Sequence, residues 1–131
     1  MNRNILVIED NEQNLYLATF LLESHGCTVA AARSGPEGIA LADEIRPALI
    51  ILDIQLPLMD GYAVARALRQ NPALDAVPLV AVTSYAMVGD RERTLEAGCN
   101  GYLEKPINPE TFMSEIERYL VGQHPDGEST L

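Results

Sequence analysis

The sequence of 131 residues contains no tryptophan, and aromatic residues make up only 5% of it. Valine, isoleucine, leucine and alanine must therefore fill most of the core. Basic residues are also few, since 9 Lys and Arg stand against 19 Asp and Glu, which gives a formal net charge of -10. A chain this acidic is a poor direct partner for nucleic acid or for an anionic membrane surface.

Only two cysteines are present, Cys27 and Cys99, which are too few for a disulfide framework and form no metal-binding motif. We expect two reduced thiols in a cytoplasmic protein. Long hydrophobic runs are absent too, because no apolar stretch approaches the roughly 20 residues that cross a bilayer. The first four residues lead directly into a short strand-like run and carry no signal-peptide core.

The sequence does contain enough apolar residues, 47%, for one folded domain, which we expect to occupy residues 1–122. The tail at residues 123–131 has no hydrophobic periodicity and is predicted to be flexible.

Five short apolar runs begin near residues 4, 27, 49, 78 and 101, and a helical pattern follows each one. This alternation predicts an α/β fold in which a parallel sheet carries helices on both faces. The runs at 49–52 and 79–82 are continuously apolar, as expected of strands buried on both faces. The predicted helices span residues 12–25, 34–45, 61–70, 88–97 and 108 onward.

Capping residues support these helix boundaries. Ser34 and Glu37 form a capping-box pattern at the second helix, and Asn108 with Pro109 suits the start of the fifth. Gly98 suits the position after the fourth helix. The inward faces are predicted to include Leu15, Phe20 and Leu22 in the first helix, and Phe112, Ile116 and Leu120 in the fifth.

The apolar runs end in polar residues that form one chemical set. The first run ends in Glu9 and Asp10, the third in Asp53, the fourth in Thr83 and the fifth in Lys105, while the second contributes only Arg33 and Ser34. Ligands of open parallel sheets bind at the carboxyl ends of the strands, so we expect these side chains to meet in one cleft.

Three carboxylates in one cleft repel one another unless a cation lies between them. At an effective dielectric near 20, two like charges about 4 Å apart repel by roughly 4 kcal/mol. Mg²⁺ suits such a site because it takes a few carboxylate oxygens and keeps water or phosphate oxygens as its other ligands. Taken alone, Asp53 could simply cap a loop, and Glu9 and Asp10 could be the acidic flank of a helix start.

Lys105 ends the fifth run and precedes Pro106, so its ammonium could reach back to an anion in the cleft. A lone lysine is more often a solvated surface residue, and Thr83 alone would be an ordinary core residue. At the end of a strand, however, the Thr83 hydroxyl can donate to a phosphoryl oxygen. A carboxylate beside a metal, a hydroxyl and an ammonium suits attack on a phosphoryl group, which forms an aspartyl-phosphate.

Four segments resemble the response-regulator receiver domain, the CheY-like phosphoacceptor of two-component signalling. They are ILVIED at 5–10, LDIQLPLMDG at 52–61, VTS at 82–84 and YLEKP at 102–106. The resemblance covers residues 3 to about 121, and the segments at 82–90 and 96–102 further resemble DivK-like single-domain regulators and the receivers of hybrid histidine kinases. It implies a doubly wound, flavodoxin-like three-layer sandwich with five parallel strands in the order 2-1-3-4-5.

The resemblance also implies a role for each residue of the cleft. Asp53 would accept a phosphoryl group from a histidine kinase or histidine phosphotransfer protein, and Thr83 and Lys105 would bind its oxygens. Mg²⁺ would be bound by Glu9, Asp10, Asp53 and the backbone carbonyl of Gln55. Tyr102 would turn inward as Thr83 moves toward the phosphate, so these two residues would form the switch. The bond between Lys105 and Pro106 is expected to be cis.

In the family, the face of the fourth helix, fifth strand and fifth helix binds downstream proteins. The chain would act as a monomer or a phosphorylation-dependent dimer, without an output domain and with no catalysis beyond its own phosphorylation and dephosphorylation. Gln55 and Tyr85 occupy variable positions that tune the phosphate lifetime in the family, so that lifetime stays open. Neither His25 nor His124 is placed as a phosphodonor, so the kinase is another protein or another part of a longer chain.

Two other functions use related chemistry. A phosphatase of the haloacid-dehalogenase type also has an aspartate nucleophile and Mg²⁺, but its motif places a second aspartate and a threonine where Gln55 and Pro57 follow Asp53. A flavodoxin-like cofactor binder needs a phosphate loop rich in Ser, Thr and Gly after its first strand. Glu9 and Asp10 would repel a phosphate there, so a receiver domain is the favoured interpretation.

Overall fold

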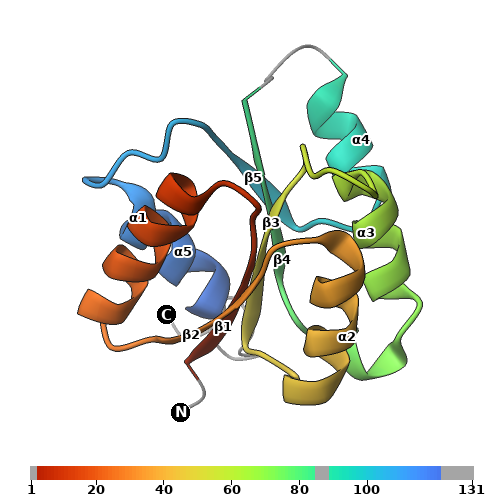
Figure 1. The fold of residues 1–131 in the computed structure, drawn as a ribbon, viewed down its shortest axis with the longest axis horizontal. Helices are drawn as coiled ribbons and strands as arrows, with labels where there is room; N and C mark the ends of the chain where they lie inside the picture. Colours follow the sequence, from red (N-terminus) through yellow and green to blue (C-terminus); the bar gives the residue numbers. More distant parts are fainter. Residues whose placement is uncertain (1–2, 85–88, 122–131) are drawn as a thin grey trace.

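The computed structural model describes residues 3–84 and 89–121, which form one parallel sheet with helices on both faces (Figure 1). The strands are β1 (Asn4–Ile8), β2 (Thr28–Ala32), β3 (Leu49–Asp53), β4 (Leu79–Thr83) and β5 (Gly101–Glu104). They lie in the order β2-β1-β3-β4-β5, which confirms the predicted doubly wound fold.

The helices of the described residues are α1 (Glu12–Ser24), α2 (Gly35–Ile45), α3 (Gly61–Arg69), the short 3-10 helix η1 (Pro72–Leu74), α4 (Asp90–Glu96) and α5 (Phe112–Val121). α1 and α5 cover one face of the sheet, and α2, α3 and α4 cover the other (Figure 1). Within residues 3–84 and 89–121, no helix is long and apolar enough to span a membrane.

Polar side chains cap the first three α-helices. Asn11, Ser34 and Asp60 precede α1, α2 and α3, and each side-chain oxygen accepts a hydrogen bond from a backbone N–H in the first turn. Glu37 does not complete the predicted capping box, because its Oε1 accepts from the N–H of Arg33 rather than from that of Ser34. The three helices end at or next to the predicted positions.

The fifth helix begins later than the sequence predicts. α5 starts at Phe112, so the predicted start at Asn108 and Pro109 is wrong. Asn108 caps a separate turn instead: its Oδ1 accepts from the N–H of Glu110 at 2.9 Å, and its backbone carbonyl accepts from both Thr111 and Phe112. For the fourth helix, the predicted start at Val88 lies outside the described residues.

The sheet separates two apolar clusters. Every residue of β3 and β4 is buried, as their continuous apolar runs predicted. Phe112, Ile116 and Leu120 of α5 are buried in the cluster that α5 shares with α1, which confirms their inward positions. Burying such a side chain contributes roughly 1.5–3 kcal/mol to the stability of the fold. The ends of the strands are therefore held in place by a well-packed core.

Phe20 does not face the core, so its predicted inward position is wrong. The inward stripe of α1 consists of Leu15, Ala18, Leu21 and Leu22. Phe20 lies off that stripe with 58% of its surface exposed and stacks on Tyr16, with 6.4 Å between the ring centroids. The two residues are four positions apart, which places them on one outer face of the helix.

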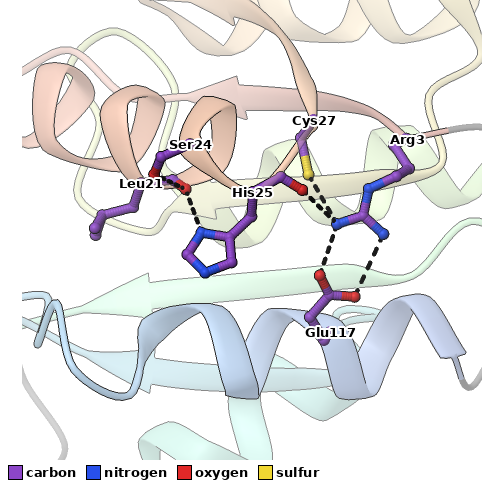
Figure 2. A network of polar contacts seen from close by, with 6 residues as sticks. All are labelled: Arg3, Leu21, Ser24, His25, Cys27 and Glu117. Carbon is purple, nitrogen blue, oxygen red and sulfur yellow. Dashed lines mark hydrogen bonds and ion pairs between the residues drawn. The ribbon is translucent and has the colours of Figure 1, made fainter.

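The side of the sheet on which the strands begin is called here its amino-terminal edge, and the side on which they end its carboxyl edge. At the amino-terminal edge, Arg3 connects β1 with the end of α1 and with α5 (Figure 2). It directly precedes β1, and its Nη2 atom lies 2.6 Å from Glu117 Oε2 in α5. The same nitrogen donates to the carbonyl of His25 at 3.1 Å and contacts the thiol of Cys27 at 3.5 Å. Burial raises the pKa of that thiol, whereas the hydrogen bond from Arg3 lowers the pKa of Glu117. The C-terminal end of α1 is thus tied to β1 and α5.

Arg69, the last residue of α3, has a similar role at the same edge. Its guanidinium donates to the carbonyls of Gly98 (2.9 Å), Leu74 (2.8 Å) and Val77 (3.0 Å) and to Asn100 Oδ1 (2.9 Å). The Asn100 oxygen also accepts from the N–H of Leu79 at 2.8 Å. These bonds connect α3 to the segments that enter β4 and β5.

Candidate functional site

Glu9, Asp10 and Asp53 lie together at the carboxyl edge because β1 and β3 are neighbours. The register pairs Ile8 with Leu52. Glu9, which follows β1, therefore lies beside Asp53, the last residue of β3. Carboxylate oxygens of the three acidic residues all lie within 4.8 Å of one another. Glu9 and Asp53 are buried, with 5% and 2% of their surface exposed, whereas Asp10 is exposed.

This crowding changes the acidity of Glu9. Burial, together with the hydrogen bond to Asp53 and its charge, raises the pKa of the Glu9 carboxyl to about 7. The N–H of Asn11, which donates to Glu9 Oε2 at 3.1 Å, and the ammonium of Lys105 oppose this rise only in part. The Glu9 carboxyl is thus less acidic than an ordinary glutamate, first because it is buried and then because Asp53 lies beside it.

Lys105 supplies the cation of the site. Its Nζ lies 3.1 Å from Asp53 Oδ2 and 3.5 Å from Glu9 Oε1. Its backbone N–H donates to the Thr83 carbonyl at 2.8 Å, and its peptide bond to Pro106 is cis, as expected. One ammonium thus contacts two of the three carboxylates, and the cluster of carboxylate oxygens fits a divalent cation.

The turn after β3 carries Gln55 against the buried Asp53. The N–H of Gln55 donates to Asp53 Oδ1 at 2.9 Å, and its side-chain Oε1 accepts from the N–H of Ser84 at 3.1 Å. These bonds connect the loops that follow β3 and β4. Thr83, just before Ser84, is buried at the end of β4. The backbone carbonyl of Gln55 stays a predicted metal ligand.

Tyr102 lies on β5 opposite Ala81 and packs with the cluster beneath α2, α3 and α4. Thr83 follows Ala81 by two residues, so Thr83 and Tyr102, the predicted switch, share one face of the sheet. From α4, Arg91 places its Cζ atom 5.8 Å from the centroid of the Tyr102 ring. Sequence reasoning missed Arg91, because nothing local in a helix tells which ring of another element an arginine will contact.

Gly61 shapes the site, although the sequence suggested only that it starts a helix. A Cβ atom there would lie 2.3 Å from the Ile54 Cα, and its N–H donates to the Ile54 carbonyl at 2.9 Å. Glycine therefore allows α3 to begin close to the end of β3, which fixes the loop that carries Gln55. The available signal was a glycine directly after the capping residue Asp60.

Other polar residues of the predicted set make different contacts. Ser34 caps α2, and Arg33 forms an ion pair with Glu12 of α1, with 3.6 Å between Nη1 and Oε2. His25 lies at the amino-terminal edge beside Arg3, which donates to its carbonyl (Figure 2). Tyr85 and His124 lie outside the described residues.

Known proteins resemble this chain along most of its length. A family model described as the response regulator receiver domain matches residues 5–117. The polar-differentiation response regulator DivK of Brucella ovis is 41% identical over 120 residues, which cover 92% of this chain and 98% of that protein.

Solved structures agree in fold. The receiver domain of the sensor histidine kinase PA1611 from Pseudomonas aeruginosa PAO1, solved with a magnesium ion coordinated in its active site cleft, is 33% identical with a TM-score of 0.84. That match covers 92% of this chain and 98% of the other. The chemotaxis protein CheY4 of Vibrio cholerae is 26% identical with a TM-score of 0.86, over 91% of this chain and 99% of the other.

Proposed function

Because this chain belongs to the receiver domains of two-component response regulators, we propose that Asp53 is its phosphoacceptor. The donor is the phosphohistidine of a histidine kinase or of a histidine phosphotransfer protein. The position of the Asp53 carboxylate carries the proposal. It is buried at the end of β3, 3.1 Å from the Lys105 ammonium and among the carboxylates of Glu9 and Asp10.

Mg²⁺ is the proposed cofactor, bound by Glu9, Asp10, Asp53 and the backbone carbonyl of Gln55. The closeness of the three carboxylates supports it, because a cation would offset the repulsion from Asp53 that contributes to the raised pKa of Glu9. Magnesium in the cleft of the similar PA1611 receiver domain is in accord with this choice. When bound, the ion would neutralise the carboxylates and the incoming phosphoryl oxygens, which lets two anionic groups approach.

In the proposed transfer, Asp53 is the nucleophile. One of its carboxylate oxygens forms a bond to phosphorus while the bond from phosphorus to the donor imidazole nitrogen breaks, and the imidazole leaves with the electron pair. Lys105 and the Thr83 hydroxyl donate to the phosphoryl oxygens and stabilise the charge on them. The N–H of Gln55 orients the Asp53 side chain through its 2.9 Å hydrogen bond. Beyond this reaction and hydrolysis of the product, we propose no enzymatic activity.

Thr83 and Tyr102 form the proposed switch. As Thr83 moves toward the phosphoryl group, Tyr102 turns inward and alters the face of α4, β5 and α5. That face has a cavity of about 590 Å³, whose lining includes Arg91, Tyr102 and Glu115. We propose that a downstream protein binds there, and that the chain is a monomer or dimerises on phosphorylation.

The domain is proposed to span residues 1–122, and the proposed flexible tail at 123–131 lies outside the described residues. Cys27 and Cys99 are free thiols, which supports the proposed cytoplasmic location.

The assignment of Asp53 is tested by incubating the protein with acetyl phosphate and Mg²⁺ and measuring its intact mass. Wild-type protein should gain one phosphoryl group, and Asp53→Asn should gain none, because an amide is not a nucleophile toward phosphorus. Asp43→Asn is the matched control, since Asp43 lies on α2 and pairs with Arg46 outside the cleft. Equal phosphate incorporation by Asp53→Asn and wild-type protein would reject the assignment.

A further inference from the structure

α4 is attached on two sides by contacts between a guanidinium and an aromatic ring. The Cζ atom of Arg93 lies 4.2 Å from the ring centroid of Tyr62, which is buried on α3. The Cζ atom of Arg91 lies 5.8 Å from the ring centroid of Tyr102, which is half-buried on β5. A cation above an aromatic face is attracted by the negative charge of that face. α4 thus makes the same kind of contact with a buried ring, Tyr62, and with a half-buried ring, Tyr102.

The face of the sheet next to Tyr102 carries small side chains, toward which its ring could turn. Tyr102 packs against the core cluster on one side and lines the cavity, together with Arg91 and Leu95 of α4. Directly opposite on β4 is Ala81, whose side chain is only a methyl group, and Thr83 follows on the same face. The guanidinium of Arg91 lies 5.8 Å from the ring centroid, close to the roughly 6 Å limit of a cation–π contact, so a ring that turned out of this position would lose the contact.

We propose that Arg91 is a positioning residue for Tyr102. Its guanidinium stabilises the ring at the cavity and thereby opposes the inward turn that phosphorylation of Asp53 favours. This inference rests on the proposed function, in which Thr83 and Tyr102 are the switch. A ligand shifts such an equilibrium only by its differential affinity for the two states, so removing Arg91 should make the inward state easier to reach.

The first test is the affinity for beryllofluoride, a phosphoryl mimic, measured in the presence of Mg²⁺. Arg91→Ala should bind it about two- to five-fold more tightly than wild-type protein, as expected for loss of one exposed cation–π contact. Arg91→Lys should restore most of the wild-type affinity. Arg93→Ala is the matched control, because it removes the same charge from the same helix but a different ring contact. An unchanged affinity of Arg91→Ala, or an equal gain in Arg93→Ala, would overturn the proposal.

The second test follows the Tyr102 ring itself by ¹⁹F NMR of protein labelled with 3-fluorotyrosine, with Tyr102→Phe used for assignment. Without beryllofluoride, Arg91→Ala should move the Tyr102 resonance toward its position in the beryllofluoride-bound wild type, and Arg93→Ala should leave it in place. In a Tyr102→Leu background, Arg91→Ala should not alter beryllofluoride affinity. A resonance unmoved by Arg91→Ala refutes the role of Arg91 alone, whereas beryllofluoride binding that survives Asp53→Asn refutes the proposed function.

Discussion

The amino-terminal and carboxyl edges of the sheet differ in the partners of their charged side chains. At the amino-terminal edge, the guanidiniums of Arg3 and Arg69 each meet several acceptors. At the carboxyl edge, the carboxylates of Glu9, Asp10 and Asp53 lie together, and the ammonium of Lys105 pairs with those of Glu9 and Asp53. At the first edge the charged donors have hydrogen-bond acceptors within the folded chain, whereas at the second edge carboxylates lie within 4.8 Å of one another.

This difference separates stability from function within one sheet. A hydrogen bond of a charged donor contributes at most roughly 1.5–3 kcal/mol, and less where water reaches it, as at the partly exposed pair of Arg3 and Glu117. Like charges about 4 Å apart at the other edge oppose folding by amounts of similar size. Substitutions at the amino-terminal edge should therefore alter unfolding without altering phosphoryl chemistry, and changes of proton or metal concentration should act on the carboxyl edge.

The largest expected effect on stability is that of Arg69→Ala, a loss of about 3–4 kcal/mol in the free energy of unfolding. The substitution removes the charged donor from the carbonyls of Gly98, Leu74 and Val77. Urea unfolding measures the loss. Arg66→Ala, at an exposed position of the same helix, is the control and should change the free energy by less than about 0.5 kcal/mol. Similar losses in both variants would mean that the contacts of Arg69 with the carbonyls do not stabilise this edge.

Glu9 gives the next effect, a dependence of stability on pH in the absence of divalent metal. Its pKa is raised from an ordinary value of 4.5 to about 7, so between these values the folded chain binds a proton that the unfolded chain releases. The resulting stabilisation is complete below pH 4.5 and is lost as the pH rises through 7, by at most about 3 kcal/mol.

The measurement is urea unfolding of wild-type protein and Glu9→Gln from acidic to mildly alkaline pH, with a chelator present. The difference between the two proteins isolates Glu9 from the other titrating groups. Wild-type protein should lose stability relative to Glu9→Gln as the pH rises. A constant difference would show that the charge of Glu9 is already balanced by Lys105.

The smallest expected effect belongs to the ion pair of Arg3 and Glu117. Its side chains are 26% and 37% exposed, and pairs at such positions contribute no more than about 1 kcal/mol. A double-mutant cycle of Arg3→Ala and Glu117→Gln by urea unfolding gives the coupling energy. A coupling as large as the loss in Arg69→Ala would mean that exposure does not weaken contacts at this edge.

Much of the fold and the candidate site could be predicted because both depend on local patterns. Apolar runs of strand length define the sheet, and the polar residue after each run lies at the carboxyl edge whatever the side chains of the helices are. That is why Glu9, Asp10 and Asp53 were predicted to meet, and the register of β1 and β3 confirms it.

Predictions failed where a residue depends on distant partners or on small rotations of a helix. Phe20 is apolar but lies off the inward stripe of α1, which residue type alone does not reveal. The contacts of Arg69 and Arg91 join residues far apart in the chain, and no local signal marks them. The raised pKa of Glu9 depends on burial, which sequence spacing does not give.

The central claim is that the carboxyl edge needs a cation before it can serve as a phosphoacceptor site. Its most direct test is the free energy of unfolding of wild-type protein and Asp53→Asn at mildly alkaline pH, with increasing Mg²⁺. Wild-type protein should become more stable in proportion to the logarithm of the Mg²⁺ concentration, once this exceeds the dissociation constant. Asp53→Asn should be more stable than wild-type protein without metal and gain less from it. A wild-type stability that does not respond to Mg²⁺, or an equal gain in Asp53→Asn, would contradict the claim.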